Sequence, residues 1–113
     1  EIQSEYDFLN FSKDHYIKTN VTREEKIEFS DKVLKVNKFG FKQERNLVIT
    51  DKALYNLKKT QLKRRIDLKA IKGITLAKST DEFVIHCNDE DYDYQYISPK
   101  KKTIVEILAK FII

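Results

Sequence analysis

The fold is decided by the stretch Lys35-Val-Asn-Lys-Phe-Gly-Phe-Lys-Gln-Glu-Arg-Asn-Leu-Val-Ile-Thr-Asp-Lys-Ala-Leu-Tyr55. Gly40 stands within it at the point where the chain must reverse direction. Apolar residues recur at every second position before and after this turn, namely at Leu34 and Val36 and at Leu47 and Ile49. A period of two residues is typical of β-strands. The stretch therefore predicts two strands joined by a hairpin, followed by a turn and a third strand.

Similar short segments, separated by polar turns, continue along the chain. Strands are expected near residues 31–38, 45–50, 53–57, 62–67, 73–78, 82–88 and 92–97. Strands at such close spacing favour an antiparallel meander that is closed as a barrel or sandwich.

The last segment has the periodicity of an α-helix. Ser98 fits an N-cap, and Pro99 fits the first helical position. Apolar residues with the spacing of one helical face follow at Ile104, Ile107, Leu108, Phe111 and Ile112. Seven strands and one amphipathic helix form the element order of a pleckstrin-homology barrel. The prediction is a mainly β (α+β) fold, with a seven-stranded antiparallel barrel or sandwich capped by one C-terminal helix.

Residues 1–30 are predicted to form a short helical or irregular arm ahead of the pleckstrin-homology-like domain at residues 31–113. Thr22 and Glu25 match a capping box, in which the two side chains satisfy free backbone amides reciprocally. A short helix is therefore expected at residues 22–29.

Composition and charge limit the classes of function. The net charge is +4, but residues 31–72 hold thirteen Lys or Arg against four Asp or Glu, a net charge of +9. Such a segment indicates either a polyanionic partner met by one face or a solvated lysine-rich surface. The single cysteine excludes an internal disulfide and a cysteine-based zinc site, and it favours a reducing compartment. Because the sequence starts at Glu1 rather than Met, we expect a module of a longer protein. That protein is expected to be cytoplasmic.

The predicted hairpin gathers cations around its turn. Lys35 and Lys38 precede Gly40, and Lys42 and Arg45 follow it. We expect these four side chains to form an anion receptor, assisted by the backbone N–H groups of the turn. The phosphorylated head group of a membrane lipid is the anion that fits this receptor best.

Two aromatic residues, Phe39 and Phe41, flank Gly40 at the tip of the hairpin. They either insert into the acyl boundary of a membrane beside the head groups or fold back onto the rim of the barrel. The sequence leaves both arrangements open.

With this order of elements in place, the sequence resembles the tail homology 1 domain of class I myosins, over roughly residues 31–112. The matching blocks are Lys35–Lys42, Arg45–Thr50, Ala53–Tyr55, Lys63–Asp67, Ile71–Thr75 and Asp81–His86. The resemblance implies binding of anionic phospholipids, notably phosphoinositides, at a signature hairpin. It places one cation late in the first strand and another early in the next, where Lys35 and Arg45 stand. A hairpin that looks one residue shorter than usual, and Glu44 before Arg45, depart from the family pattern.

Other charged clusters have ordinary explanations. The basic run at residues 58–65 fits a strand edge protected by charge as well as it fits a ligand site, and alternation sends Arg64 to the opposite face from Lys63 and Arg65. The acidic residues Asp89, Asp91 and Asp93 lack the Gly and Glu that an EF-hand requires. They are expected to form a solvated loop. If that loop faces the end opposite the hairpin, it would orient the domain by repulsion from an anionic membrane.

These observations favour one function over two others. The leading hypothesis is a non-enzymatic module that targets a larger protein to anionic membranes, peripherally and without a cofactor or a metal. No nucleophile elbow, phosphate loop or zinc pattern is present. The alternative is a protein-interaction scaffold without lipid binding, since this fold serves many functions. Nucleic-acid binding is disfavoured because the acidic loop would repel phosphates.

Overall fold

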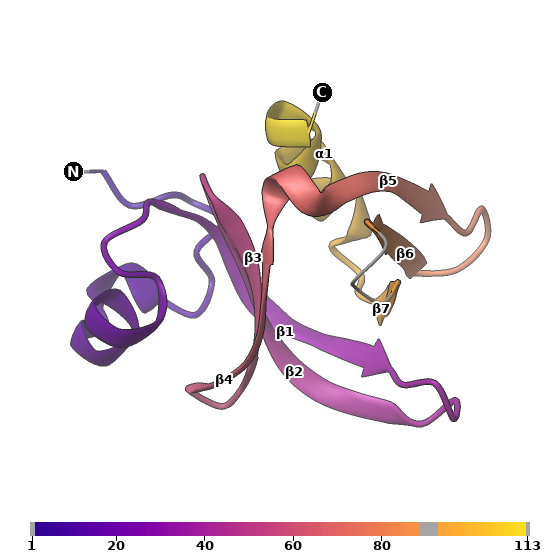
Figure 1. The fold of residues 1–113 in the computed structure, drawn as a ribbon, viewed down its shortest axis with the longest axis horizontal. Coiled ribbons are helices and arrows are strands. Elements are labelled where there is room, and N and C mark those ends of the chain that lie inside the picture. The colour runs from indigo at the N-terminus through magenta and orange to yellow at the C-terminus, as the bar shows by residue number, and fades with distance from the viewer. Residues whose placement is uncertain (1, 89–92, 113) are drawn as a thin grey trace.

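The computed structural model describes residues 2–88 and 93–112 of the chain. Seven strands form one antiparallel sheet in the order β4-β3-β2-β1-β7-β6-β5, and the helix α1 follows them (Figure 1). Their bounds are β1 (Ile27–Val36), β2 (Lys42–Thr50), β3 (Ala53–Lys58), β4 (Gln61–Asp67), β5 (Ile71–Leu76), β6 (Glu82–Cys87), β7 (Tyr94–Ile97) and α1 (Lys101–Ile112). The predicted fold class is confirmed, and each expected strand overlaps an observed one.

Strand β1 joins the two halves of the sheet. It pairs with β2 along its length, and its last residues pair with β7, from Leu34 opposite Ile97 to Val36 opposite Gln95. The sheet curls around this strand, and its inner face encloses the main core (Figure 1). Fully buried side chains of this core include Phe29, Leu47, Ile49, Leu54, Phe83, Ile85 and Tyr96.

Helix α1 packs on the main core through the predicted apolar face. Its buried side chains are Ile104, Ile107 and Leu108, whereas Phe111 and Ile112 are half-buried against the same core. The hydroxyl oxygen of Ser98 accepts the backbone N–H of Lys100 at 3.0 Å, in keeping with its predicted capping role. Figure 1 shows α1 at the top, far from the tip of the β1–β2 hairpin at the lower right. No helix in the described ranges is long and apolar enough to cross a membrane.

The prediction of a short helix at residues 22–29 is wrong. The arm contains a 3₁₀ turn, η1 (Phe11–Lys13), and a π-helix, η2 (Ile17–Val21), and β1 begins at Ile27. Thr22 closes the π-helix, because its hydroxyl donates to the carbonyl of Ile17 at 3.4 Å. The Glu25 carboxylate accepts hydrogen bonds from Thr50 and Tyr55 in the sheet, so the two side chains do not form a capping box.

The arm covers the outer face of β2 and β3 and builds a second apolar cluster there. This cluster contains Phe11, Ile17, Val21, Ile27, Val48, Ala53, Tyr55 and Leu57. Strand β1 runs across residue 30, where the sequence analysis placed the boundary between arm and domain. The amine of Lys100 ties the start of α1 to β1, where it pairs with Asp31, and to the arm, where it lies 4.1 Å from the centroid of the Phe8 ring.

Candidate functional site

The turn of the β1–β2 hairpin is held by Asn37. Its side-chain oxygen accepts the backbone N–H groups of Phe39 at 2.9 Å and Phe41 at 3.0 Å. Its carbonyl accepts the N–H of Gly40 at 2.9 Å, and Gly40 takes a φ of 84°, which lacks strain only for glycine. These three amides are therefore satisfied inside the turn. The expectation that they assist anion binding is corrected for all three.

Lys35 and Arg45 share the inner face of the sheet near its open end. Alternation puts Lys35 on the side of buried Val33 and Arg45 on the side of buried Leu47. Val33 lies opposite Arg45 in the β1–β2 register, so Lys35 is a diagonal neighbour of Arg45.

The two cations influence each other. Partial burial lowers the pKa of the Lys35 amine, and the positive charge of Arg45 lowers that pKa further. The Arg45 guanidinium donates to the backbone carbonyl of Glu44 at 2.7 Å. Within the described part of the chain, neither Lys35 nor Arg45 forms an ion pair with a carboxylate. The arrangement therefore keeps two like charges close together without internal neutralisation.

The other two predicted cations are placed differently. Lys42 lies opposite Val36, so its side chain leaves the outer face of the sheet, away from Lys35 and Arg45. Lys38 lies in the turn, with its amine 5.3 Å from the centroid of the Phe39 ring. The structure therefore brings Lys35 and Arg45 together on one face and separates Lys42 from them.

The aromatic tip of the hairpin projects from the body of the protein. Phe39 is 73% exposed and Phe41 is 68% exposed. The arrangement in which these rings fold back onto the rim is therefore not the one observed.

A pocket of about 590 Å³ opens where β1 and β7 cease to pair. Its lining consists of Lys35, Val36, Asn37, Lys38, Val84, Asp93, Tyr94 and Gln95. The amine of Lys35 lies 5.7 Å from the centroid of the Tyr94 ring. Asp93 is thus at the same end as the basic hairpin, so the condition for orienting the domain by repulsion is not met at this residue. The other two aspartates of that loop, Asp89 and Asp91, lie outside the described residues.

Glu44, the residue that departs from the family pattern, does not neutralise Arg45. It alternates onto the outer face, where its carboxylate lies 3.8 Å from the amine of Lys32. A second hollow of about 370 Å³ adjoins this pair, and both Arg45 and Lys59 border it. Lys59 is therefore a neighbour of the hairpin rather than a remote cation.

Arg64 is a cation of the inner face that the sequence analysis did not choose. It is two residues from Ile66 on β4, so it shares the face on which Ile66 is buried in the main core. It lies opposite Asn56 in the β3–β4 register. Burial raises the pKa of the Cys87 thiol, and the positive charge of Arg64 acts against that rise. Arg65 points the other way, and its guanidinium donates to the Tyr55 hydroxyl at 3.2 Å. The sequence signal was present in the alternation, which separates Arg64 from its neighbours.

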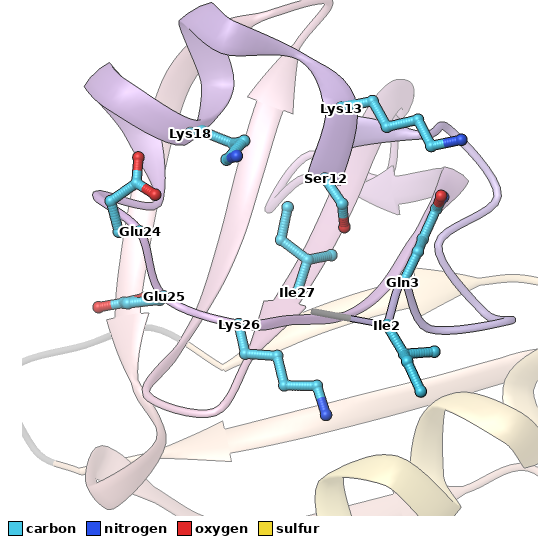
Figure 2. A pocket seen from close by; sticks show the side chains of 9 residues that line it. All are labelled: Ile2, Gln3, Ser12, Lys13, Lys18, Glu24, Glu25, Lys26 and Ile27. Carbon is cyan, nitrogen blue, oxygen red and sulfur yellow. The ribbon is translucent and has the colours of Figure 1, made fainter.

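A third concavity, of about 390 Å³, lies beside the arm (Figure 2). Its lining consists of Ile2, Gln3, Ser12, Lys13, Lys18, Glu24, Glu25, Lys26 and Ile27. Charges of both signs line it, and the Glu25 carboxylate is committed to Thr50 at 2.7 Å and Tyr55 at 2.5 Å. Within residues 2–88 and 93–112, no three His, Cys, Asp or Glu side chains are grouped so as to hold a metal ion.

Solved structures with the same architecture include a complex of human RhoA with the DH/PH fragment of PDZRHOGEF. That match has a TM-score of 0.71 at 16% identity and covers 85% of this chain and 31% of the other. The Slm1-PH domain in complex with inositol-4-phosphate matches with a TM-score of 0.58 at 13% identity, over 74% of this chain and 92% of that one. At such identities the likeness establishes a pleckstrin-homology-like fold.

Similarity of sequence identifies the family to which the chain belongs. Myosin heavy chain IB of Acanthamoeba castellanii is 32% identical over 119 residues, which cover 94% of this chain and 10% of that heavy chain. This chain thus spans about a tenth of that relative. The family model matches residues 5–112, so the likeness includes most of the arm that the resemblance over residues 31–112 had left out. The chain therefore belongs to the tail homology 1 family of unconventional myosins, a tail module described as actin- and lipid-binding.

Proposed function

We propose that this chain is a membrane-targeting module that binds anionic phospholipids, phosphoinositides among them, as part of a longer cytoplasmic protein. Lys35 and Arg45 are the proposed phosphate ligands, and Arg64 is a further cation of the same inner face. The observation that carries the proposal is the close pair of Lys35 and Arg45, which has no carboxylate partner among the described residues. The lipid-binding description of the family supports it.

The chemistry of the pair fits a phosphate. Arg donates two parallel charge-assisted hydrogen bonds to phosphate oxygens, and Lys adds a compact charge. A phosphate between Lys35 and Arg45 would replace their mutual repulsion by attraction to both. The amine of Lys35 is already partly desolvated, so a phosphate ligand would restore the charge stabilisation that the fold removes.

The hairpin tip supports contact with a membrane rather than with a soluble anion. Phe39 and Phe41 are exposed beside the cations, and Phe is among the residues that bury at the boundary between head groups and acyl chains. Lys38 and Lys42 add attraction of about 1 kcal/mol each near an anionic surface. These four side chains can contribute to membrane binding without contacting a specific phosphate.

The alternative is a protein-interaction barrel without lipid binding. The mixed-charge concavity beside the arm favours this alternative, because its lining residues come from the arm and the start of β1 and not from the hairpin turn. The family description, which also names actin, points in the same direction. Nucleic acid remains a poor candidate, because Asp93 at the hairpin end would repel a phosphate backbone.

We expect the chain to cosediment with anionic vesicles and to dissociate as salt is added. The cause is the net charge of +9 on residues 31–72, which is screened over about 10 Å at 0.1 M salt. Vesicles that contain phosphatidylglycerol, with or without phosphoinositide, are compared with neutral phosphatidylcholine vesicles. Equal sedimentation with neutral and anionic vesicles at low salt would rule out the lipid function and leave the protein-interaction alternative.

Replacing Arg45 by Ala should weaken vesicle binding roughly tenfold or more, because a charge-assisted hydrogen bond contributes about 1.5–3 kcal/mol and each 1.4 kcal/mol is a factor of ten. Lys102→Ala is the matched control, since it removes one exposed cation from α1, far from the hairpin. It should have a smaller effect, about 1 kcal/mol at most. Lys59 is a poorer control because it borders the same hollow as Arg45. Equal losses in two folded variants would leave only a diffuse basic surface.

A further inference from the structure

Charges of both signs line the pocket between β1 and β7. Lys35 and Lys38 lie on its β1 side, and Asp93 lies on its β7 side. The Asp93 side chain is 52% exposed. Hydrogen bonds from His86 and from the backbone N–H of Cys87 lower the pKa of Asp93, which keeps its carboxylate ionised at neutral pH. An anion-binding end of the molecule therefore has a fixed negative charge in its adjoining pocket.

The carboxylate of Asp93 retains acceptor capacity. His86 Nδ1 bonds to Oδ2 at 2.8 Å, and the amide of Cys87 donates to Oδ1 at 3.3 Å. A carboxylate offers about four lone-pair sites, so about two remain for a ligand. The Nε2 atom of His86 is engaged with the hydroxyl of Thr75 at 2.6 Å, which fixes the ring and with it Asp93. The carboxylate is thus positioned to accept from a cationic donor inside the pocket.

This combination of charges selects among lipid head groups. A head group that carries only phosphates is attracted by Lys35 and Lys38 but repelled by Asp93. A head group that carries an ammonium beside its phosphate satisfies both signs, because the ammonium donates to Asp93 while the phosphate meets Lys38. Phosphatidylserine has this arrangement and keeps a net negative charge. The volume of about 590 Å³ is ample for its head group.

We infer that this pocket is a subsite for an amine-bearing anionic phospholipid of the phosphatidylserine type, with Asp93 as the residue that determines specificity. The inference rests on the proposed lipid function and adds to it a second head group beside the one held by Lys35 and Arg45. The exposed rings of Phe39 and Phe41 next to the pocket favour a lipid in a membrane over a soluble amine as its occupant.

The test compares vesicles of phosphatidylserine with vesicles of phosphatidylglycerol at equal mole fraction, since both lipids carry one net negative charge and only the first has an amine. The unaltered chain should bind the phosphatidylserine vesicles several-fold more tightly. Asp93→Asn should weaken binding to phosphatidylserine and strengthen binding to phosphatidylglycerol. Opposite signs are expected because the substitution removes both the amine acceptor and the repulsion of phosphate.

Glu106→Gln is the matched control, because it removes an exposed carboxylate from α1, away from the pocket. It should change binding to the two vesicle types by the same factor. An unaltered chain without preference for phosphatidylserine, or an Asp93→Asn variant that binds both vesicle types more tightly, overturns the subsite. If the unaltered chain binds neither type, the proposed lipid function has failed as well, so the two failures are distinguishable.

Discussion

Replacing Leu108 by Ala is expected to lower the free energy of unfolding by about 2–5 kcal/mol. Leu108 is fully buried in the main core, on the face of α1 that packs against the sheet. The substitution removes apolar contacts and leaves a cavity that the strands fill only in part. Small domains have total stabilities of about 5–15 kcal/mol, so the loss is a large share. Urea unfolding followed by circular dichroism measures the difference.

Ile112→Ala is the control for Leu108→Ala, because Ile112 is of similar size on the same helix but only half-buried. Its expected loss is smaller, since part of its surface already contacts water. Phe111, which the helical pattern grouped with the buried residues, is also half-buried, so its replacement should cost less than the roughly 3–5 kcal/mol of a fully buried Phe. Equal losses for Leu108→Ala and Ile112→Ala would contradict the packing of α1 described above.

The sheet and the helix were predictable because each repeats a short-range signal. The pleat sends successive side chains of a strand to opposite faces, and burial of one face then makes every second residue apolar, as Phe83, Ile85 and Cys87 show in β6. The apolar face of α1 is visible in the sequence for the same reason, because its apolar residues recur with the period of a helix. Such signals need no knowledge of which segments meet in space, and the order of elements then identified the fold.

The arm was predicted less well because long-range contacts decide its structure. Thr22 and Glu25 have the spacing of a capping box, but Glu25 gains a stronger set of partners in Thr50, Tyr55 and Arg65. Those partners come from three other strands, and the local pattern does not reveal them. Tertiary contacts therefore overrode a local preference, as they often do for short helices.

Some features of the candidate site could also be predicted from local patterns, and others could not. Lys42 and Arg45 are three residues apart on one strand, so alternation alone places them on opposite faces. Alternation likewise places Arg64 on the face of the apolar Ile66, which is buried in the main core. The capture of the turn amides by Asn37, and the presence of Asp93 in the pocket with Lys38, required the fold itself. Charge composition indicated the candidate site, and the geometry of the fold showed which charges share one face.

Replacing Asp7 by Asn is expected to destabilise the protein strongly at neutral pH and somewhat less in acid. Asp7 is 3% exposed, and its carboxylate accepts from the hydroxyl of Ser30 at 2.5 Å and from the amides of Phe11 at 3.1 Å and Ser12 at 2.9 Å. An amide side chain presents a donor where the carboxylate had an acceptor. Each buried donor left unsatisfied costs about 1–3 kcal/mol, so the loss at pH 7 should reach several kcal/mol.

The pH dependence follows from the direction of the Asp7 pKa. Burial acts to raise this pKa, but the hydrogen bonds from Ser12, Ser30 and the amide of Phe11 outweigh burial and lower the pKa below its ordinary value. A lowered pKa means that the ionised form stabilises the fold above the unfolded pKa of about 3.9, and that this stabilisation disappears as the pH falls through the folded pKa. Urea unfolding at pH 7, 5 and 3 should therefore show the difference between the unaltered chain and Asp7→Asn shrinking towards pH 3. A difference that stays constant with pH would show that the buried carboxylate is not the source of the stabilisation.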